Sequence, residues 1–170
     1  MDSRTATAFL CPRGEGPHKK AAPPKDEIQL RRSFYLTGST LESWQVLDIR
    51  TAIKQLRALP EVRNASLTIE ASGTQAVNVL YASLFEPPVA RLDLRDVPVS
   101  HLHASAPAYL NVLKYLDVPQ AAAMAAEHSL VRIRTTEPGA WDLARDLSPE
   151  EDPHRGLKVL SGPDETSPRE

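Results

Sequence analysis

Short apolar segments alternate with helical patterns along most of this chain, and this alternation limits the possible folds most strongly. The stretch "SLTIEASGTQAVNVLYASLFEPP" (66–88) is typical of a strand, a tight turn and a helix that ends at two prolines. The segments "VARLDL" (89–94) and "SLVRIRT" (129–135) are typical of two further strands. Strands that alternate with helices indicate a parallel sheet, and we expect helices on both of its faces. The sequence therefore predicts an α/β fold of the doubly wound kind.

The segments around this pattern predict additional elements. We expect a short strand in "SFYLTG" (33–38) and a helix over 40–59, with Ser39 and Glu42 as its capping box. Further helices are predicted in "PAYLNVLKYL", "PQAAAMAAEH" and "PGAWDLARDL", and "GLKVL" is a candidate fourth strand. Trp44 and Trp141 are expected in the core.

Composition divides the chain into three parts. Residues 1–27 are rich in Pro, Gly and charge and predict a flexible N-terminal segment, whereas 28–147 carry the α/β pattern. Residues 148–170 form a polar, Pro-rich tail, and we expect both end segments to pack little because they offer few apolar side chains.

The overall charge and residue content argue against several classes of function. The net charge of −2 gives no electrostatic basis for binding nucleic acid or an anionic membrane. The single cysteine excludes an internal disulfide, and no apolar run approaches the roughly 18 residues of a membrane span. We expect no cofactor and no metal ion. His101 and His103, two residues apart in a loop, form the one pair that could face a metal together, and no third ligand accompanies them.

The loops after the three predicted strands are the expected ligand-binding edge, because parallel sheets bind ligands beyond the carboxyl ends of their strands. These loops are 71–75, 95–106 and 135–139. The first has the strand-turn-helix form of a nucleophile elbow, which requires small residues two positions before and after the nucleophile. Around Ser72 those positions hold Glu70 and Thr74, whereas Gly73 has Ala71 on one side and Gln75 on the other.

This turn has three interpretations. Ser72 is the candidate nucleophile by chemistry, but Gly73 fits the strained position better and has no side chain to react. A dinucleotide-binding turn would require glycines at 71, 73 and 76, and only Gly73 is present. The purely structural interpretation is a tight turn at Gly73, with Ser72 or Thr74 capping the helix. We predict that Gly73, and not Ser72, occupies the strained position.

Residues of about 28–145 resemble the C-terminal half of α/β-hydrolases of the acetyl xylan esterase and prolyl oligopeptidase-like type. The resemblance lies in "RRSFYLTGSTLESWQVLDIRTAIKQLRAL", "LTIEASGTQAVNVLYASLFEPPVARLDL" and "SHLHASAPAYLNVLKYLDVPQAAAMAAEHSLVRI", together with the Pro-Arg-Gly turn in "PRGEGP". It implies a partial α/β-hydrolase sheet and an ester- or peptide-cleaving ancestry. It also implies that a longer native chain supplies the N-terminal half of the fold.

The resemblance implies a serine, an acid and a histidine, in that order along the chain. Ser72 lies one position before the expected nucleophile, and Glu137 is the carboxylate in the loop where the acid belongs. The histidine should follow the last strand, but His154 precedes "GLKVL" and no histidine comes later. We therefore expect a hydrolase-like module that is catalytically degenerate or truncated. The alternative is an active serine hydrolase that acts on acyl esters or peptides with Ser72 as its nucleophile. The ligand expected in either case is a small acyl ester or a carbohydrate ester.

Overall fold

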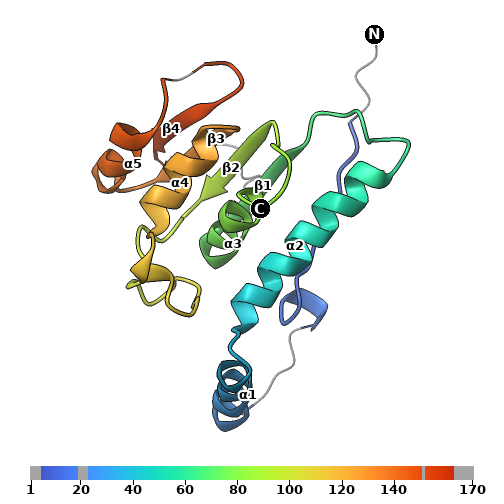
Figure 1. Cartoon of the computed structure of the whole chain (residues 1–170), viewed down its shortest axis with the longest axis vertical. Helices are drawn as coiled ribbons and strands as arrows, with labels where there is room; N and C mark the ends of the chain where they lie inside the picture. Colours follow the sequence, from blue (N-terminus) through green and yellow to red (C-terminus); the bar gives the residue numbers. More distant parts are fainter. Residues whose placement is uncertain (1–4, 19–22, 151, 163–170) are drawn as a thin grey trace.

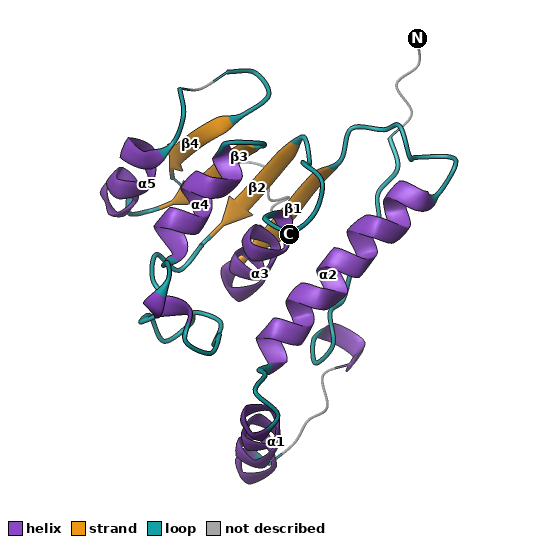
Figure 2. Cartoon of the chain, in the orientation of Figure 1, coloured by secondary structure: helices purple, strands orange, loops and turns teal. Residues whose placement is uncertain are grey.

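A four-stranded, all-parallel sheet forms the centre of the protein (Figures 1 and 2). The computed structural model describes residues 5–18, 23–150 and 152–162. The strands lie in sequential order: β1 (Thr68–Ser72), β2 (Arg91–Arg95), β3 (Leu130–Thr135) and β4 (Gly156–Ser161). The predicted parallel arrangement of the first three strands is confirmed, and "GLKVL" forms the fourth. The coarse prediction of an α/β fold is therefore correct.

The helices that connect neighbouring strands lie on one face of this sheet. They are α3 (Gly73–Ser83), α4 (Val118–Ala126) and α5 (Asp142–Leu147), the last preceded by the 3₁₀ turn η3 (Pro138–Trp141). Figure 1 shows all three in front of the strands. Parallel crossovers are nearly always right-handed, so strands in sequential order place every connecting helix on the same side. The expectation of helices on both faces is therefore wrong for the described residues.

The core lies between the sheet and these helices. The inward-facing side chains of β2 and β3 are Leu92, Leu94, Val131 and Ile133, each at most 1% exposed. Residues 76–82 of α3 are all buried, and α4 buries five alanines completely or nearly so. Full burial of one such aliphatic side chain contributes about 1.5–3 kcal/mol, so this layer fixes the strand ends from which the loops emerge.

Helix α2 (Leu41–Ala58) packs along α3. Its bounds are close to the predicted range 40–59. Its capping box is formed by Thr40 and Ser43, one residue later than the predicted pair. Thr40 is extended, and its Oγ1 accepts from the Ser43 N–H at 2.9 Å, while Ser43 Oγ accepts from the Thr40 N–H at 3.0 Å. Trp44 is 39% exposed beneath the Arg13 guanidinium, so its predicted core position is wrong, whereas Trp141 is fully buried as predicted.

Two predicted elements are wrong. The expected strand at 33–38 falls at the end of helix α1 (Pro24–Leu36), because a short aromatic run has no period that separates strand from helix. The expected helix at 107–116 is a loop with a single 3₁₀ turn, η2 (Val112–Lys114). Asn111 has a φ of +61°, and this left-handed residue interrupts the helical pattern.

The end segments pack more than their composition predicts. Strand β4 lies inside the predicted tail, pairs with β3 over its whole length and buries Leu157. Near the other end, Arg13 binds Asp48 through two guanidinium hydrogen bonds of 2.6 and 2.9 Å. The prediction of little packing is therefore wrong at these two places. Predictions for 1–4, 19–22, 151 and 163–170 lie outside the described residues. The remaining element of the described residues is a short 3₁₀ turn, η1 (Gly16–His18).

Candidate functional site

The candidate site is the edge of the sheet where β1, β2 and β3 end. The register pairs Ser72 with Arg95 and Arg95 with Arg134, so the three strands end side by side. The loops after these strands therefore emerge at one edge, as predicted for 71–75, 95–106 and 135–139. What this edge can do depends on which side chains these loops bring together.

The turn after β1 has glycine at its strained position. Gly73 begins α3 directly after the last residue of β1 and has a φ of +57°, whereas Ser72 is extended at φ −136° and ψ 156°. The prediction that Gly73, and not Ser72, occupies this position is confirmed. A Cβ on Gly73 would meet no atom within 4 Å, so the left-handed backbone conformation, and not crowding, favours glycine here. The residue at the apex of the turn thus has no functional group.

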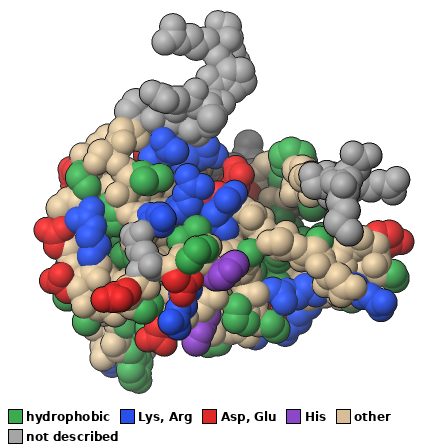
Figure 3. Space-filling model, turned by 90° about the horizontal axis from the view of Figure 1, so that it is seen from above, with side chains coloured by type: hydrophobic (Ala, Val, Ile, Leu, Met, Phe, Trp, Pro, Cys, Tyr) green, Lys and Arg blue, Asp and Glu red, His purple; other side chains and the backbone are tan. Residues whose placement is uncertain are grey.

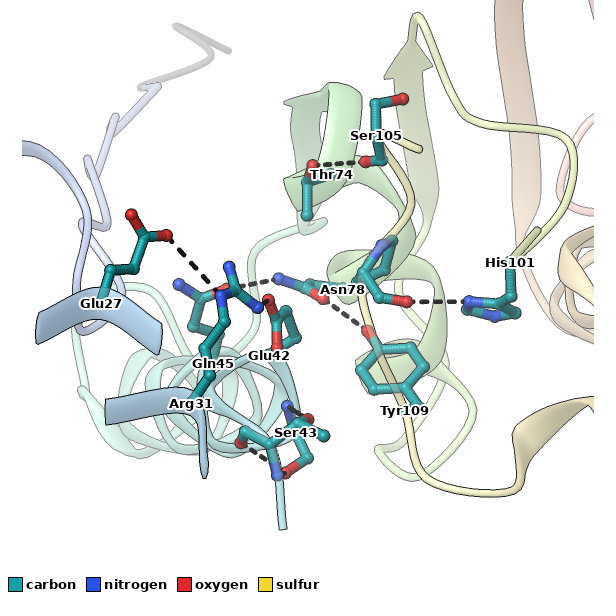
Figure 4. Close-up of polar contacts among 12 residues, drawn as sticks. Glu27, Arg31, Glu42, Ser43, Gln45, Thr74, Asn78, His101, Ser105 and Tyr109 are labelled. Atoms are coloured by element: carbon teal, nitrogen blue, oxygen red, sulfur yellow. Dashed lines mark hydrogen bonds and ion pairs between the residues drawn. The ribbon is translucent and has the colours of Figure 1, made fainter. Parts of the chain in front are cut away.

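The polar side chains of this turn do not cap the helix. Ser72 occupies the N-cap position without a side-chain capping bond. Thr74 Oγ1 donates instead to the Ser105 carbonyl at 2.8 Å, which ties the loop after β2 to the first turn of α3 (Figure 4). The expectation that Ser72 or Thr74 caps α3 is therefore wrong.

The same loop brings a serine and a histidine together. His103 Nδ1 lies 2.8 Å from Ser105 Oγ and also accepts from the Ser105 N–H at 3.3 Å. The bond from the Ser105 N–H favours the tautomer in which Nδ1 is an acceptor, and in that tautomer the Ser105 hydroxyl donates to it. Both residues are exposed. The pair places a serine hydroxyl within hydrogen-bond distance of an imidazole nitrogen, and it was not anticipated from the sequence.

His101 is held inside the loop by two tyrosines and a carbonyl. Its Nδ1 lies 3.0 Å from the Pro107 oxygen, which can only accept, so Nδ1 carries the proton. Nε2 then accepts from the Tyr81 hydroxyl at 2.9 Å. The rings of His101, Tyr81 and Tyr109 have centroids 5.0–5.5 Å apart. Burial raises the pKa of Tyr81, and that of Tyr109 well above its usual value, so both phenols are donors at neutral pH.

A buried amide network links this loop to α2 and α3 (Figure 4). The fully buried Asn78 donates to Gln45 Oε1 at 2.9 Å and to Gln75 Oε1 at 3.0 Å, and its Oδ1 accepts from the Tyr109 hydroxyl. The sequence carries one signal for this network, since Asn78 is a polar residue within the apolar run "AVNVLYA". A buried amide requires partners, and this network fixes the loop over α3.

Asp117 fixes the other end of the loop. Its carboxylate accepts from the hydroxyl of Ser100 at 2.5 Å, from the N–H of His101 at 2.8 Å and from the N–H of Val118 at 2.8 Å. Burial opposes ionisation of this carboxyl, but the hydrogen bonds from Ser100, His101 and Val118 together lower its pKa. Asp117 is therefore the N-cap of α4 and an anchor for the loop.

The residues of the expected triad are not brought together. Glu137 is exposed in the loop after β3, where its N–H donates to Thr135 Oγ1 at 3.1 Å. His154 precedes β4 and His128 precedes β3, so both lie toward the amino ends of the parallel strands, opposite the end that carries Ser72. Among the described residues, the histidine side chains form hydrogen bonds to Tyr81, Pro107 and Ser105, and His128 lies 4.0 Å from Glu127, but none contacts Ser72 or Glu137.

Comparisons with known proteins add no further identification. No protein-family model, curated protein or solved structure matches the chain. Within the described ranges, no group of three or more His, Cys, Asp or Glu side chains is placed to hold a metal ion. No helix in that part of the chain is long and apolar enough to span a bilayer.

Proposed function

We propose that this chain is a non-catalytic α/β-hydrolase-like module, descended from a serine esterase of the acetyl xylan esterase type. The observation that carries the proposal is the turn after β1, where Gly73 has the positive φ and Ser72 is part of the extended strand. A nucleophile elbow uses its strained residue to lift the reacting hydroxyl above the sheet. Glycine at this position leaves the turn without a nucleophile.

The surroundings of Ser72 support the same proposal. A serine hydroxyl is a poor nucleophile until a base within hydrogen-bond reach takes its proton. The ring nitrogens of His101 bond to Tyr81 and Pro107, and His103 bonds to Ser105. Glu137, the acid that the hydrolase resemblance implies, has no histidine contact among the described residues. At most, this edge of the sheet binds a small acyl or carbohydrate ester without cleaving it.

One observation favours the enzymatic alternative. In the His103–Ser105 pair, the serine hydroxyl lies 2.8 Å from an imidazole nitrogen that also accepts the Ser105 N–H, which is the contact that a general base makes. The pair lies on the expected edge, and its loop is tied to α3 through Thr74. If the chain is an active serine hydrolase, this geometry makes Ser105 a better candidate nucleophile than Ser72.

Hydrolysis of p-nitrophenyl acetate distinguishes these proposals. The assay compares the wild-type chain with Ser72→Ala, Ser105→Ala and the matched control Ser83→Ala, whose hydroxyl only bonds to the backbone of α3. We expect one background rate for all four proteins. A rate that falls at least tenfold in Ser72→Ala alone would establish Ser72 as the nucleophile. The same fall in Ser105→Ala alone would establish the His103–Ser105 alternative.

A further inference from the structure

Helix α1 packs little against the rest of the protein. Figure 1 shows it at the lower end of the molecule, below α2, which is the end turned away from the viewer in Figure 3. Within residues 25–36, only Arg31 and Phe34 are partly buried, and the others are exposed. Four apolar side chains of α1 are 45–89% exposed: Ile28, Leu30, Tyr35 and Leu36. Burial of apolar surface therefore contributes little to holding α1 in place.

One ion pair joins α1 to α2. Arg31 Nη1 donates to Glu42 Oε1 at 2.8 Å, and Figure 4 shows Arg31 between Glu42 and Glu27 of its own helix. The Glu27–Arg31 contact, at 3.6 Å, lies within α1. Among the described residues, no other ion pair or side-chain hydrogen bond links α1 to another helix or to a strand. An isolated helix of 13 residues is marginal in water, so this ion pair largely determines whether α1 stays folded against α2.

The Glu42 carboxylate is only half satisfied in this position. Its side chain is 9% exposed, and its Oε2 is buried without a hydrogen bond from the residues that the structure describes. A buried acceptor without a donor raises the free energy of the closed arrangement. If α1 moved away, water would bind this oxygen and offset part of the loss of the ion pair. The closed and open positions of α1 therefore differ less in free energy than the short ion pair alone suggests.

The connection between the two helices is short. Helix α1 ends in a turn in which Ser39 N–H donates to the Phe34 carbonyl at 3.0 Å and Gly38 has a φ of +71°. The capping box of α2 begins at Thr40. Because both helix ends are fixed by their own hydrogen bonds, a rotation of α1 relative to α2 is confined to the backbone between these caps.

We propose that α1 is a hinged strap, which Arg31 holds closed over Glu42 and which opens by rotation at 38–39. Opening uncovers a carboxylate one helical turn from Gln45 on α2. Gln45 accepts from Gln75 and Asn78 in the amide network that fixes the loop over α3. The strap therefore controls access to the α2 side of this network.

Hydrogen exchange measured by mass spectrometry on the full chain tests the proposal. The wild type is compared with Arg31→Gln and with two matched controls. Arg32→Gln removes the neighbouring exposed cation, and Glu27→Gln removes only the contact within α1. We expect the amides of 28–36 to exchange at least about tenfold faster in Arg31→Gln than in either control, because an open strap loses its helical hydrogen bonds. The amides of 45–58 in α2 should be unchanged.

Salt and carboxyl labelling provide independent measurements. Screening weakens a partly exposed ion pair, so about 0.5 M NaCl should speed exchange of α1 in the wild type and not in Arg31→Gln. Carbodiimide coupling of glycine ethyl ester should label Glu42 faster in Arg31→Gln than in Arg32→Gln. Equal α1 exchange in these two variants would overturn the proposal, and so would exchange of 28–36 in the wild type at the rate of an unfolded peptide. An equal rise in α2 exchange would also overturn it, because the variant would then lose stability as a whole.

Discussion

The hydrogen bond between Tyr109 and Asn78 should be a major anchor of the loop between β2 and α4. Tyr109→Phe removes the hydroxyl without changing the packing volume, so no cavity term is added. Asn78 is 0% exposed, and in the variant its Oδ1 loses the bond from Tyr109 without access to water. A buried acceptor left without its donor costs about 1–3 kcal/mol. We therefore expect the free energy of unfolding to fall by about 2 kcal/mol.

Tyr81→Phe is the matched control for this prediction. It removes a hydroxyl from the same aromatic cluster, but the partner, His101, is only half-buried, so water can replace the bond. We expect a loss below about 1 kcal/mol for this variant. Urea unfolding monitored by circular dichroism measures the free energy of unfolding of both variants. If this free energy depends on urea concentration with the same slope in each variant, the change is in stability. A loss for Tyr109→Phe no larger than that for Tyr81→Phe would refute the role of the buried amide network.

Two further predictions concern the turn and the loop anchor. Gly73→Ala should lower the free energy of unfolding by about 1–2 kcal/mol in the same urea assay, because φ is +57°. Gly139→Ala, where φ is not positive and the nearest atom is 3.9 Å away, should change little, and an equal loss in both would contradict the assigned strain. For Asp117, the folded-state pKa is below the ordinary value of 3.8, so its stabilising effect is present above about pH 4 and lost as the pH falls through the folded-state pKa. The stability difference between wild type and Asp117→Asn should therefore shrink in acid, and a difference independent of pH from 7 to 3 would count against this anchor.

The strands and the strained turn could be predicted because local chemistry determines them. The alternation in 66–94 and the paired Pro87 and Pro88 mark β1, α3 and β2, and only glycine tolerates the turn at 73 without strain. The helix predicted at 107–116 failed because a single left-handed residue, Asn111, overrides an apolar period. The one-sided sheet was missed because strand order is not visible in local patterns, although sequential order determines where the helices lie.

The polar part of the site was less predictable. The partners of Asn78 come from three separate segments, and Gln45 lies 33 residues away in sequence. Nothing local to "SHLHAS" distinguishes His101, held by Tyr81 and Pro107, from the exposed His103 two positions later. Such contacts depend on how the loop folds back over α3, which no period or spacing encodes.

Covalent labelling with a fluorophosphonate tests the central claim most directly, because this reagent reacts with activated serines only. The wild-type chain, Ser72→Ala and Ser105→Ala are incubated with the probe, and adducts are mapped by peptide mass spectrometry. If the module is non-catalytic, no serine should be modified above the level of heat-denatured protein. A stoichiometric adduct on Ser72 that Ser72→Ala abolishes would contradict the account.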